Sequence, residues 1–170
     1  MSMQAAQRYL QEALVRMHPT AEVRACLRPA TYDFLCTVGL PNSDELGFDF
    51  TGRMTLRPTG LVVFEQASPG RLPCLDVAQQ ELLRWEDDAA EGFINSSAEQ
   101  FVECVYAYES YLRTVQAPEK FGPFYDSSGN TANRVDYADY LQQRFEAIDP
   151  AVLHRGYYWP AFLERIEFGL

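Results

Sequence analysis

The stretch from Phe93 to Phe101 constrains the fold more than any other part of the chain, because a short apolar segment meets a helix start there. Ser96 is a residue type that caps helices through its side-chain oxygen, and Glu99 follows three residues later. This spacing predicts a capping box, in which the Ser96 hydroxyl accepts from the Glu99 amide and the Glu99 carboxylate accepts from the Ser96 amide. The helix is therefore expected to begin near Ser97.

The helix after Ser97 has two different faces. Apolar residues at helical spacing are expected to face the core: Phe101, Val105, Tyr108 and Leu112. At about 100° per residue, a more polar set falls on the opposite side: Glu99, Glu103, Tyr106 and Ser110. We expect that side to face water or a partner.

Strand-like segments precede this helix. Five of them are separated by turn signals: residues 53–56, 61–65, 72–76, 81–85 and 92–95. Sequential short strands favour an antiparallel sheet. Further helices are predicted near residues 3–17, from Pro29 to a glycine stop at Gly39, around residues 138–148, and from Pro160 to Gly169. The pattern predicts an α+β fold, with a mainly antiparallel sheet of about five to six strands and helices packed against it.

The length of the chain fits one domain. A chain of 170 residues is a usual single-domain size, so residues 1–170 are expected to form one soluble unit. No apolar run approaches the roughly 18 residues of a membrane span, and the start lacks a secretory signal. The segment Ala117 to Asn133, rich in Pro, Gly, Ser and Asn, is expected to be a long surface loop.

The cysteines and histidines carry no metal-site pattern. The four cysteines lie far apart without C-x-x-C spacing, and the two histidines stand alone. The cysteines are therefore predicted to be buried free thiols in a reducing cytoplasm, and neither a zinc site nor another cofactor is expected.

The negative charge is concentrated in the second half of the chain. Residues 1–85 hold 9 acids and 8 bases, whereas residues 86–170 hold 15 acids and 6 bases, which together give the net charge of −10. From Glu86 to Leu112 there are seven acids and no lysine or arginine. Direct nucleic-acid binding is disfavoured, because it requires a basic footprint.

Several segments, in order, resemble the SUKH immunity superfamily and within it the fourth subgroup of bacterial immunity proteins. They are Phe34-Leu35 with Val38 to Pro41, Phe93 to Ser97 with Gln100-Phe101, Asp149-Pro150-Ala151, and Trp159 through Leu163-Glu164 to Gly169-Leu170. The resemblance implies an α+β domain that binds and neutralises a cognate polymorphic toxin, often a nuclease or a nucleic-acid deaminase. It also implies a cytoplasmic inhibitor without catalysis of its own, whose recurring positions are structural.

Two features depart from that pattern. The segment Asp76 to Glu81 lacks the glycine expected at its turn, and the loop Glu119 to Asn133 is long. Such differences from the family pattern are expected to change which partner the protein binds.

An acidic inhibitor suits a nuclease or deaminase, because the clefts of these enzymes attract phosphate. The candidate partner-binding residues flank the strand-to-helix junction: Glu86, Asp87, Asp88, Glu91, Glu99, Glu103, Tyr106 and Glu109. For each one alone, a solvated surface residue is the competing interpretation. However, Glu99 and Glu103 are like charges at i, i+4, and their repulsion mildly destabilises the helix. Glu99 is compensated by the positive N-terminus of the helix, whereas Glu103 is not.

Two other function classes stay open from the sequence. One is a regulatory or scaffolding module of the same superfamily, which gene neighbourhood would distinguish from an immunity protein. The other is a small metal-dependent enzyme built on Glu86-Asp87-Asp88, although adjacent acids without a nearby histidine are usually surface residues.

Overall fold

In the computed structural model, the described part of the chain consists of residues 6, 10, 13–67, 72–86, 89–115, 134–155 and 158–168. The predicted loop over residues 117–133 lies outside these ranges, as do Asp87, Asp88 and Gly169.

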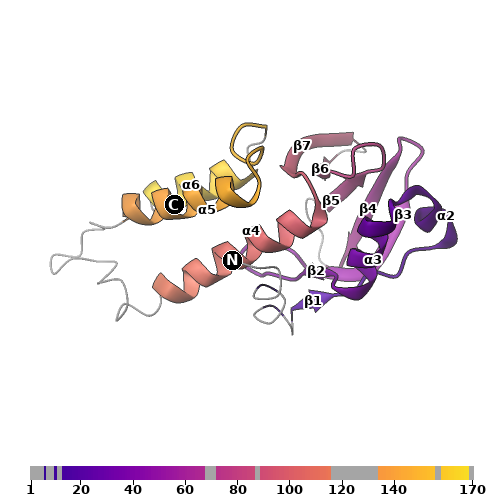
Figure 1. The fold of residues 1–170 in the computed structure, drawn as a ribbon, viewed down its shortest axis with the longest axis horizontal. Coiled ribbons are helices and arrows are strands. Elements are labelled where there is room, and N and C mark those ends of the chain that lie inside the picture. The colour runs from indigo at the N-terminus through magenta and orange to yellow at the C-terminus, as the bar shows by residue number, and fades with distance from the viewer. Residues whose placement is uncertain are drawn as a thin grey trace.

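A five-stranded antiparallel sheet forms one half of the molecule (Figure 1). Its strands follow one another in sequence and in space: β3 (Phe50–Leu56), β4 (Leu61–Gln66), β5 (Leu72–Asp76), β6 (Leu82–Glu86) and β7 (Ala89–Asn95). The predicted antiparallel sheet is confirmed, and β3 and β7 each begin three residues earlier than expected. Each strand pairs antiparallel with the one before it in sequence, so the order never crosses over.

The N-terminal segments differ more from the prediction. Leu14–Val15 form a short strand, β1, that pairs with β2 (Leu40–Pro41), so the helix predicted over residues 3–17 is wrong at its end. Of the residues before it, Ala6 is helical and most others lie outside the described ranges. A short helix, α2 (Ala21–Cys26), was missed, although Thr20 is a typical cap whose Oγ1 accepts from the Val23 amide at 3.3 Å.

The second predicted helix is confirmed as α3 (Pro29–Thr37), with proline in its first turn. Its glycine stop has two physical causes. Gly39 has φ of +93°, a conformation that L side chains rarely adopt, and a Cβ there would lie 2.2 Å from the Val15 carbonyl oxygen. Only glycine lets the chain turn from α3 into β2 while β1 lies this close.

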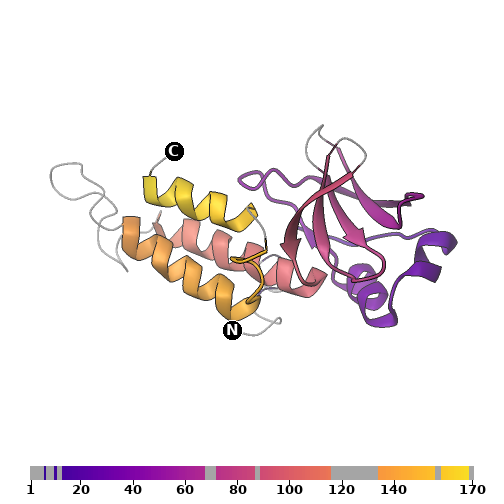
Figure 2. The same cartoon turned by 90° about the horizontal axis from the view of Figure 1, so that it is seen from above.

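Three helices form the other half of the molecule (Figure 2). They are α4 (Ala98–Val115), α5 (Arg134–Ile148) and α6 (Tyr158–Phe168), so the last helix begins two residues before the predicted Pro160. Helix α4 leaves the end of β7 and continues beyond the sheet, and α5 and α6 pack along it. The junction at residues 93–101 therefore joins the two halves.

The two faces of the sheet differ in how they are buried, because side chains alternate along a strand. The main core contains one face, including Val62, Phe64 and Leu75, together with side chains from α2 to α6. The other face carries a small separate cluster of Leu61, Val63 and Cys74, against which Leu83 and Trp85 pack.

The turn between β5 and β6 explains the missing glycine. Gln80 occupies the position with positive φ, at +64°, that glycine would take more easily. Its buried side chain compensates for this strain, because its Oε1 accepts from the Arg28 amide at 3.2 Å and its Nε2 donates to the Val77 carbonyl at 2.6 Å. The glutamine thus ties the turn to the start of α3, which a glycine could not do.

Candidate partner-binding surface

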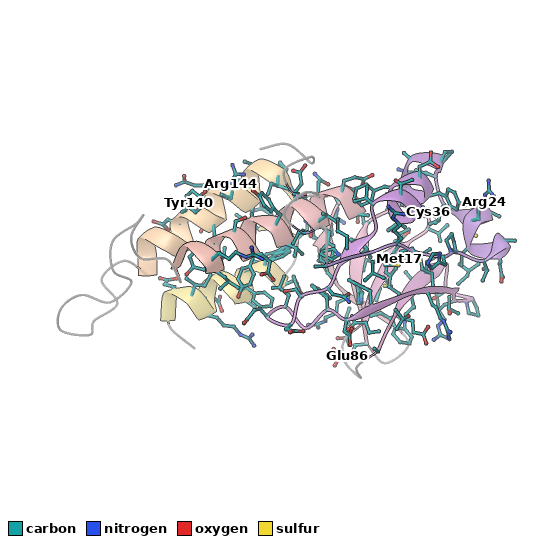
Figure 3. The ribbon with its side chains drawn as sticks, turned by 90° about the horizontal axis from the view of Figure 1, so that it is seen from below. Met17, Arg24, Cys36, Glu86, Tyr140 and Arg144 are labelled. Carbon is teal, nitrogen blue, oxygen red and sulfur yellow. The ribbon has the colours of Figure 1, made fainter. Side chains whose placement is uncertain are left out.

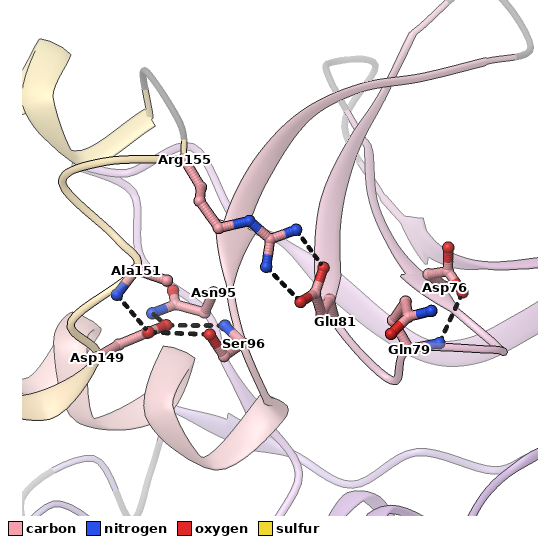
Figure 4. Close-up of polar contacts among 8 residues, drawn as sticks. All are labelled: Asp76, Gln79, Glu81, Asn95, Ser96, Asp149, Ala151 and Arg155. Carbon is pink, nitrogen blue, oxygen red and sulfur yellow. Dashed lines mark hydrogen bonds and ion pairs between the residues drawn. The ribbon is translucent and has the colours of Figure 1, made fainter.

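A polar cluster, the junction cluster of Asn95, Ser96, Asp149 and Trp159, connects the sheet to the helical half. Figure 4 shows Asn95, Ser96 and Asp149 of this cluster. The Asp149 carboxylate, only 1% exposed, accepts from the Ser96 amide at 2.7 Å and from its hydroxyl at 2.9 Å. It also accepts from Asn95 Nδ2 at 3.1 Å and from the Ala151 amide at 3.2 Å. Four donors therefore replace the water that the buried carboxylate has lost.

Asn95 extends this cluster into the last helix. Its Oδ1 accepts from Trp159 Nε1 at 3.0 Å, and both side chains are fully buried. Gln100 adds a parallel link, because its Nε2 donates to the Ile148 carbonyl at 3.0 Å. The family-like residues at the junction, after α5 and in α6 thus meet at one place and hold the fold together.

The predicted capping box is wrong. The Ser96 hydroxyl and amide both donate to Asp149, and Ser97 Oγ accepts from the Gln100 amide at 3.2 Å instead. The cap is therefore Ser97, and α4 begins at Ala98. A buried carboxylate 53 residues away is a stronger partner for Ser96 than the local capping geometry.

Cys104 lies against this cluster, with Asn95 Nδ2 3.5 Å from its Sγ. Burial raises the pKa of the Cys104 thiol well above its usual range, the Asn95 contact lowers it, and Asp149 and Glu103 raise it. Burial likewise raises the pKa of Cys74, with Asp76 adding to the effect, to about 12. Both thiols stay protonated at neutral pH, so neither is an activated nucleophile.

The predicted partner-binding acids fall into two groups. Glu86 and Glu91 lie on the β6–β7 hairpin, where Arg84 Nη2 is 3.1 Å from the Glu91 carboxylate and Arg84 Nε is 3.8 Å from that of Glu86. Arg84 therefore partly neutralises the charge of Glu86 and Glu91 within the protein. Glu86 lies on the sheet, well apart from Tyr140 and Arg144 on α5 (Figure 3).

The second group lies on α4. Glu99, Glu103 and Tyr106 share the least buried side of this helix, and each is half-buried. The predicted apolar stripe is confirmed but is wider than expected, because residues flanking it are buried as well: Ala98, Val102, Cys104, Ala107 and Tyr111. Neither Glu99 nor Glu103 forms an ion pair or hydrogen bond with the described residues.

The length of β7 separates the two groups. Glu86 pairs with the first residue of β7, Ala89, and the seven residues of this strand span about 20 Å at the usual rise before α4 begins. Glu91 is the third residue of β7, so only about 13 Å of strand follows it. The acids that are continuous in sequence therefore form two surfaces rather than one.

Glu109 belongs to a contact that the sequence did not indicate. Its Oε1 accepts from the Ser43 hydroxyl at 2.5 Å, so α4 meets the loop between β2 and β3. No sequence signal pairs these residues, which lie 66 positions apart.

No set of three or more histidine, cysteine or acidic side chains is arranged to hold a metal ion in the described part of the chain. None of the helices described there is long and apolar enough to cross a membrane.

The model of the SUKH-4 immunity protein family matches residues 3–165, almost the whole chain. Neither the curated proteins nor the solved structures contain a significant match.

Proposed function

Since this chain belongs to the SUKH-4 immunity protein family, we propose that it binds a cognate toxin of the nuclease or nucleic-acid deaminase class and blocks its active cleft with an acidic surface. Family membership over residues 3–165 is the observation that carries the toxin-binding part of this proposal. Binding would take place in the cytoplasm, where free cysteines such as the four in this chain persist.

The charge of the chain supports the proposed class of toxin. Enzymes that act on nucleic acids carry basic clefts, and a protein of net charge −10 is attracted to them. Complementary charge raises the association rate, which matters for an inhibitor that must reach the toxin before the substrate does.

The α4 acids are the stronger part of the proposed surface. Glu99 and Glu103 have no ion pair among the described residues, and Tyr106 beside them has the amphipathic side chain common in interfaces. Glu86 and Glu91 on the hairpin share Arg84, so we expect a smaller contribution from them. Asp87 and Asp88, which follow Glu86 in the sequence, are candidates on sequence grounds alone.

The direct experiment mixes the purified chain with the toxin domain encoded beside it. Isothermal titration calorimetry should detect a complex, and toxin activity on its substrate should fall as the complex forms. Absence of both binding and inhibition would contradict the proposal.

A charge reversal tests the surface separately. The double variant Glu99→Lys with Glu103→Lys should weaken association by about tenfold or more and lower the salt dependence of the association rate. The matched control is Glu164→Lys with Glu167→Lys, which makes the same change in net charge at two exposed positions on α6. If both variants bind equally well, the α4 surface is wrong even though toxin binding is right.

A further inference from the structure

The two edges of the five-stranded sheet differ in how far the rest of the chain covers them. The edge of β3 is closed at Gly52, whose carbonyl oxygen accepts from the His18 amide at 2.7 Å. A Cβ at Gly52 would lie 2.8 Å from the Arg16 carbonyl oxygen, so the segment before α2 runs directly along this edge. The opposite edge is β7, and Figure 1 shows it at the far margin of the sheet from β3 and α2.

The first four residues of β7, Ala89 to Gly92, form an open backbone edge, the β7 edge. The first three are exposed, and a Cβ at Gly92 would meet no described atom within 4 Å apart from its chain neighbours. Beyond the pairing with β6, no backbone group of these four residues has a hydrogen bond to the described part of the chain. The strand is closed from Phe93 onward, because this buried ring lies 4.5 Å from the Arg155 guanidinium.

An unpaired strand edge presents amides and carbonyls at the spacing of another extended chain. An added strand satisfies these groups with main-chain hydrogen bonds, which is a recurring way in which proteins bind peptide segments. Natural edges often carry proline or lysine against such pairing, and neither residue occurs from Ala89 to Gly92. The β7 edge is therefore able to accept a strand.

A buried donor beside this edge also lacks a partner. Arg84 lies opposite Gly92 in the register of β6 and β7, and its Nε is buried without a hydrogen bond. Its Nη2 donates to Glu91 at 3.1 Å, whereas the Glu86 carboxylate is 3.8 Å from Nε, beyond hydrogen-bond distance. Because Gly92 has no side chain, an acceptor on a strand beside β7 can reach across it to the Nε–H group.

The charge around the β7 edge selects its occupant. From Arg84 to Glu91 the sequence holds one base and four acids, Glu86, Asp87, Asp88 and Glu91, which gives a net charge of −3. A second copy pairing along the same edge would bring two such groups together, and like-charge repulsion opposes this. Two register shifts between β6 and β7 also shorten the regular edge that a second copy would need. A short basic segment is attracted instead.

We infer that the β7 edge accepts an extended basic segment of the partner protein as a further strand of the sheet, with lysine or arginine side chains beside the hairpin acids and an acceptor at Arg84 Nε. This inference rests on the proposed toxin-binding function. It assigns the β6–β7 hairpin a main-chain contact with the toxin in addition to its charge.

A short peptide tests the edge without the toxin. A capped pentapeptide of alternating lysine and valine, titrated into the isotope-labelled full chain, should shift the NMR amide signals of Ala89 to Gly92 in a saturable way. The same peptide methylated at every backbone nitrogen keeps its charge but cannot donate main-chain hydrogen bonds, so it should not shift them. Equal shifts from the two peptides, or no shifts at this edge, would overturn the inference.

A charge variant tests the basic character of the segment. Glu91→Lys reverses one charge at the edge and should weaken peptide binding by about tenfold or more. The matched control is Glu22→Lys, the same change at the exposed start of α2, which should bind as the unaltered chain does. Equal binding by the two variants would contradict the basic occupant.

A proline variant tests the main-chain contact. The amides of neighbouring strand residues point alternately toward β6 and toward the edge, so only one of Ala89 and Ala90 offers its amide to a partner. Faster hydrogen exchange in the free chain identifies that residue. Proline there should keep the fold, because no bond to β6 is lost, and should abolish the peptide shifts. Shifts that persist in the folded proline variant would overturn the inference.

The toxin arm separates this inference from the proposed function. In the toxin complex, the same edge amide should exchange its hydrogen at least about tenfold more slowly than in the free chain. The amide of Thr59, in the exposed turn between β3 and β4, is the control and should not change. If the toxin binds and the edge amide exchanges as fast as before, the inference is wrong and the proposed function stands. If the unaltered chain does not bind the toxin, the proposed function is wrong and the inference loses its partner.

Discussion

The junction cluster and the α4 surface use the same kinds of side chain in opposite ways. In the junction cluster, the Asp149 carboxylate accepts from four donors and is 1% exposed. On the α4 surface, Glu99 and Glu103 are half-buried and have no hydrogen bond or ion pair with the described residues. The polar groups bonded within the protein hold the two halves together, whereas these two carboxylates can exchange water for a partner.

The largest effect is expected for Asp149→Ala. It removes the acceptor for Asn95, Ser96 and Ala151 and leaves buried donors unpaired, so the free energy of unfolding should fall by about 3–5 kcal/mol. Urea denaturation followed by circular dichroism measures it. Asp139→Ala, at an exposed position of α5, is the control and should change the stability by less than about 0.5 kcal/mol. Equal losses of stability in the two variants would contradict the structural role of the junction cluster.

The two tryptophans give a matched pair for the next effect. Trp159→Phe loses the hydrogen bond to Asn95 and leaves the Asn95 oxygen buried without that donor, which should cost about 1–3 kcal/mol beyond the loss of ring volume. Trp85→Phe removes a buried Nε1–H that has no hydrogen-bond partner, so it should cost less. The same denaturation experiment compares them, and a larger loss for Trp85→Phe would contradict this view of the cluster.

Gln80 tests whether a satisfied buried side chain outweighs backbone strain. Gln80→Ala loses the hydrogen bonds to Arg28 and Val77 and keeps the positive φ, whereas Gln80→Gly loses the same bonds and relieves the strain. Both variants should be less stable than the natural chain, and the alanine variant should be the worse of the two by about 1 kcal/mol. A glycine variant more stable than the natural chain would show that the Gln80 side chain contributes less than its conformation costs.

The smallest effect is expected on the α4 surface. Glu103→Gln removes one of two like charges at i, i+4, so it should stabilise the chain by about 0.2–0.5 kcal/mol. Thermal unfolding at low and high salt should show this gain shrinking as salt is added. A loss of stability above about 1 kcal/mol would mean that Glu103 has a structural role like that of Asp149.

Much of the fold followed from local patterns. Short apolar segments between turn signals located all five strands of the sheet, proline and glycine bounded α3, and helical spacing identified the apolar side of α4. On the predicted polar side, the Ser110 hydroxyl is buried. Helix α2 was missed although its cap is local, whereas two other misses come from competition by distant residues. Residues 14–15 pair with β2 instead of continuing a helix, and Ser96 donates to Asp149 instead of capping α4.

The candidate site was less accessible from sequence. The acids from Glu86 to Glu109 were found by composition, but β7 separates them into two groups, and Arg84 neutralises part of one group. Glu109 was a candidate, but nothing in its local sequence indicated its hydrogen bond to Ser43.

The sequence by itself determined the α+β class, the family and the acidic character of the chain, because periodicity, turn residues and charge are local properties that survive in any arrangement. Only the tertiary structure decided which polar groups are satisfied. Hydrogen bonds of buried groups depend on donors brought together from distant segments, as at Asn95, Asp149 and Trp159. The division between residues that hold this protein together and residues offered to a partner is therefore a property of its packing.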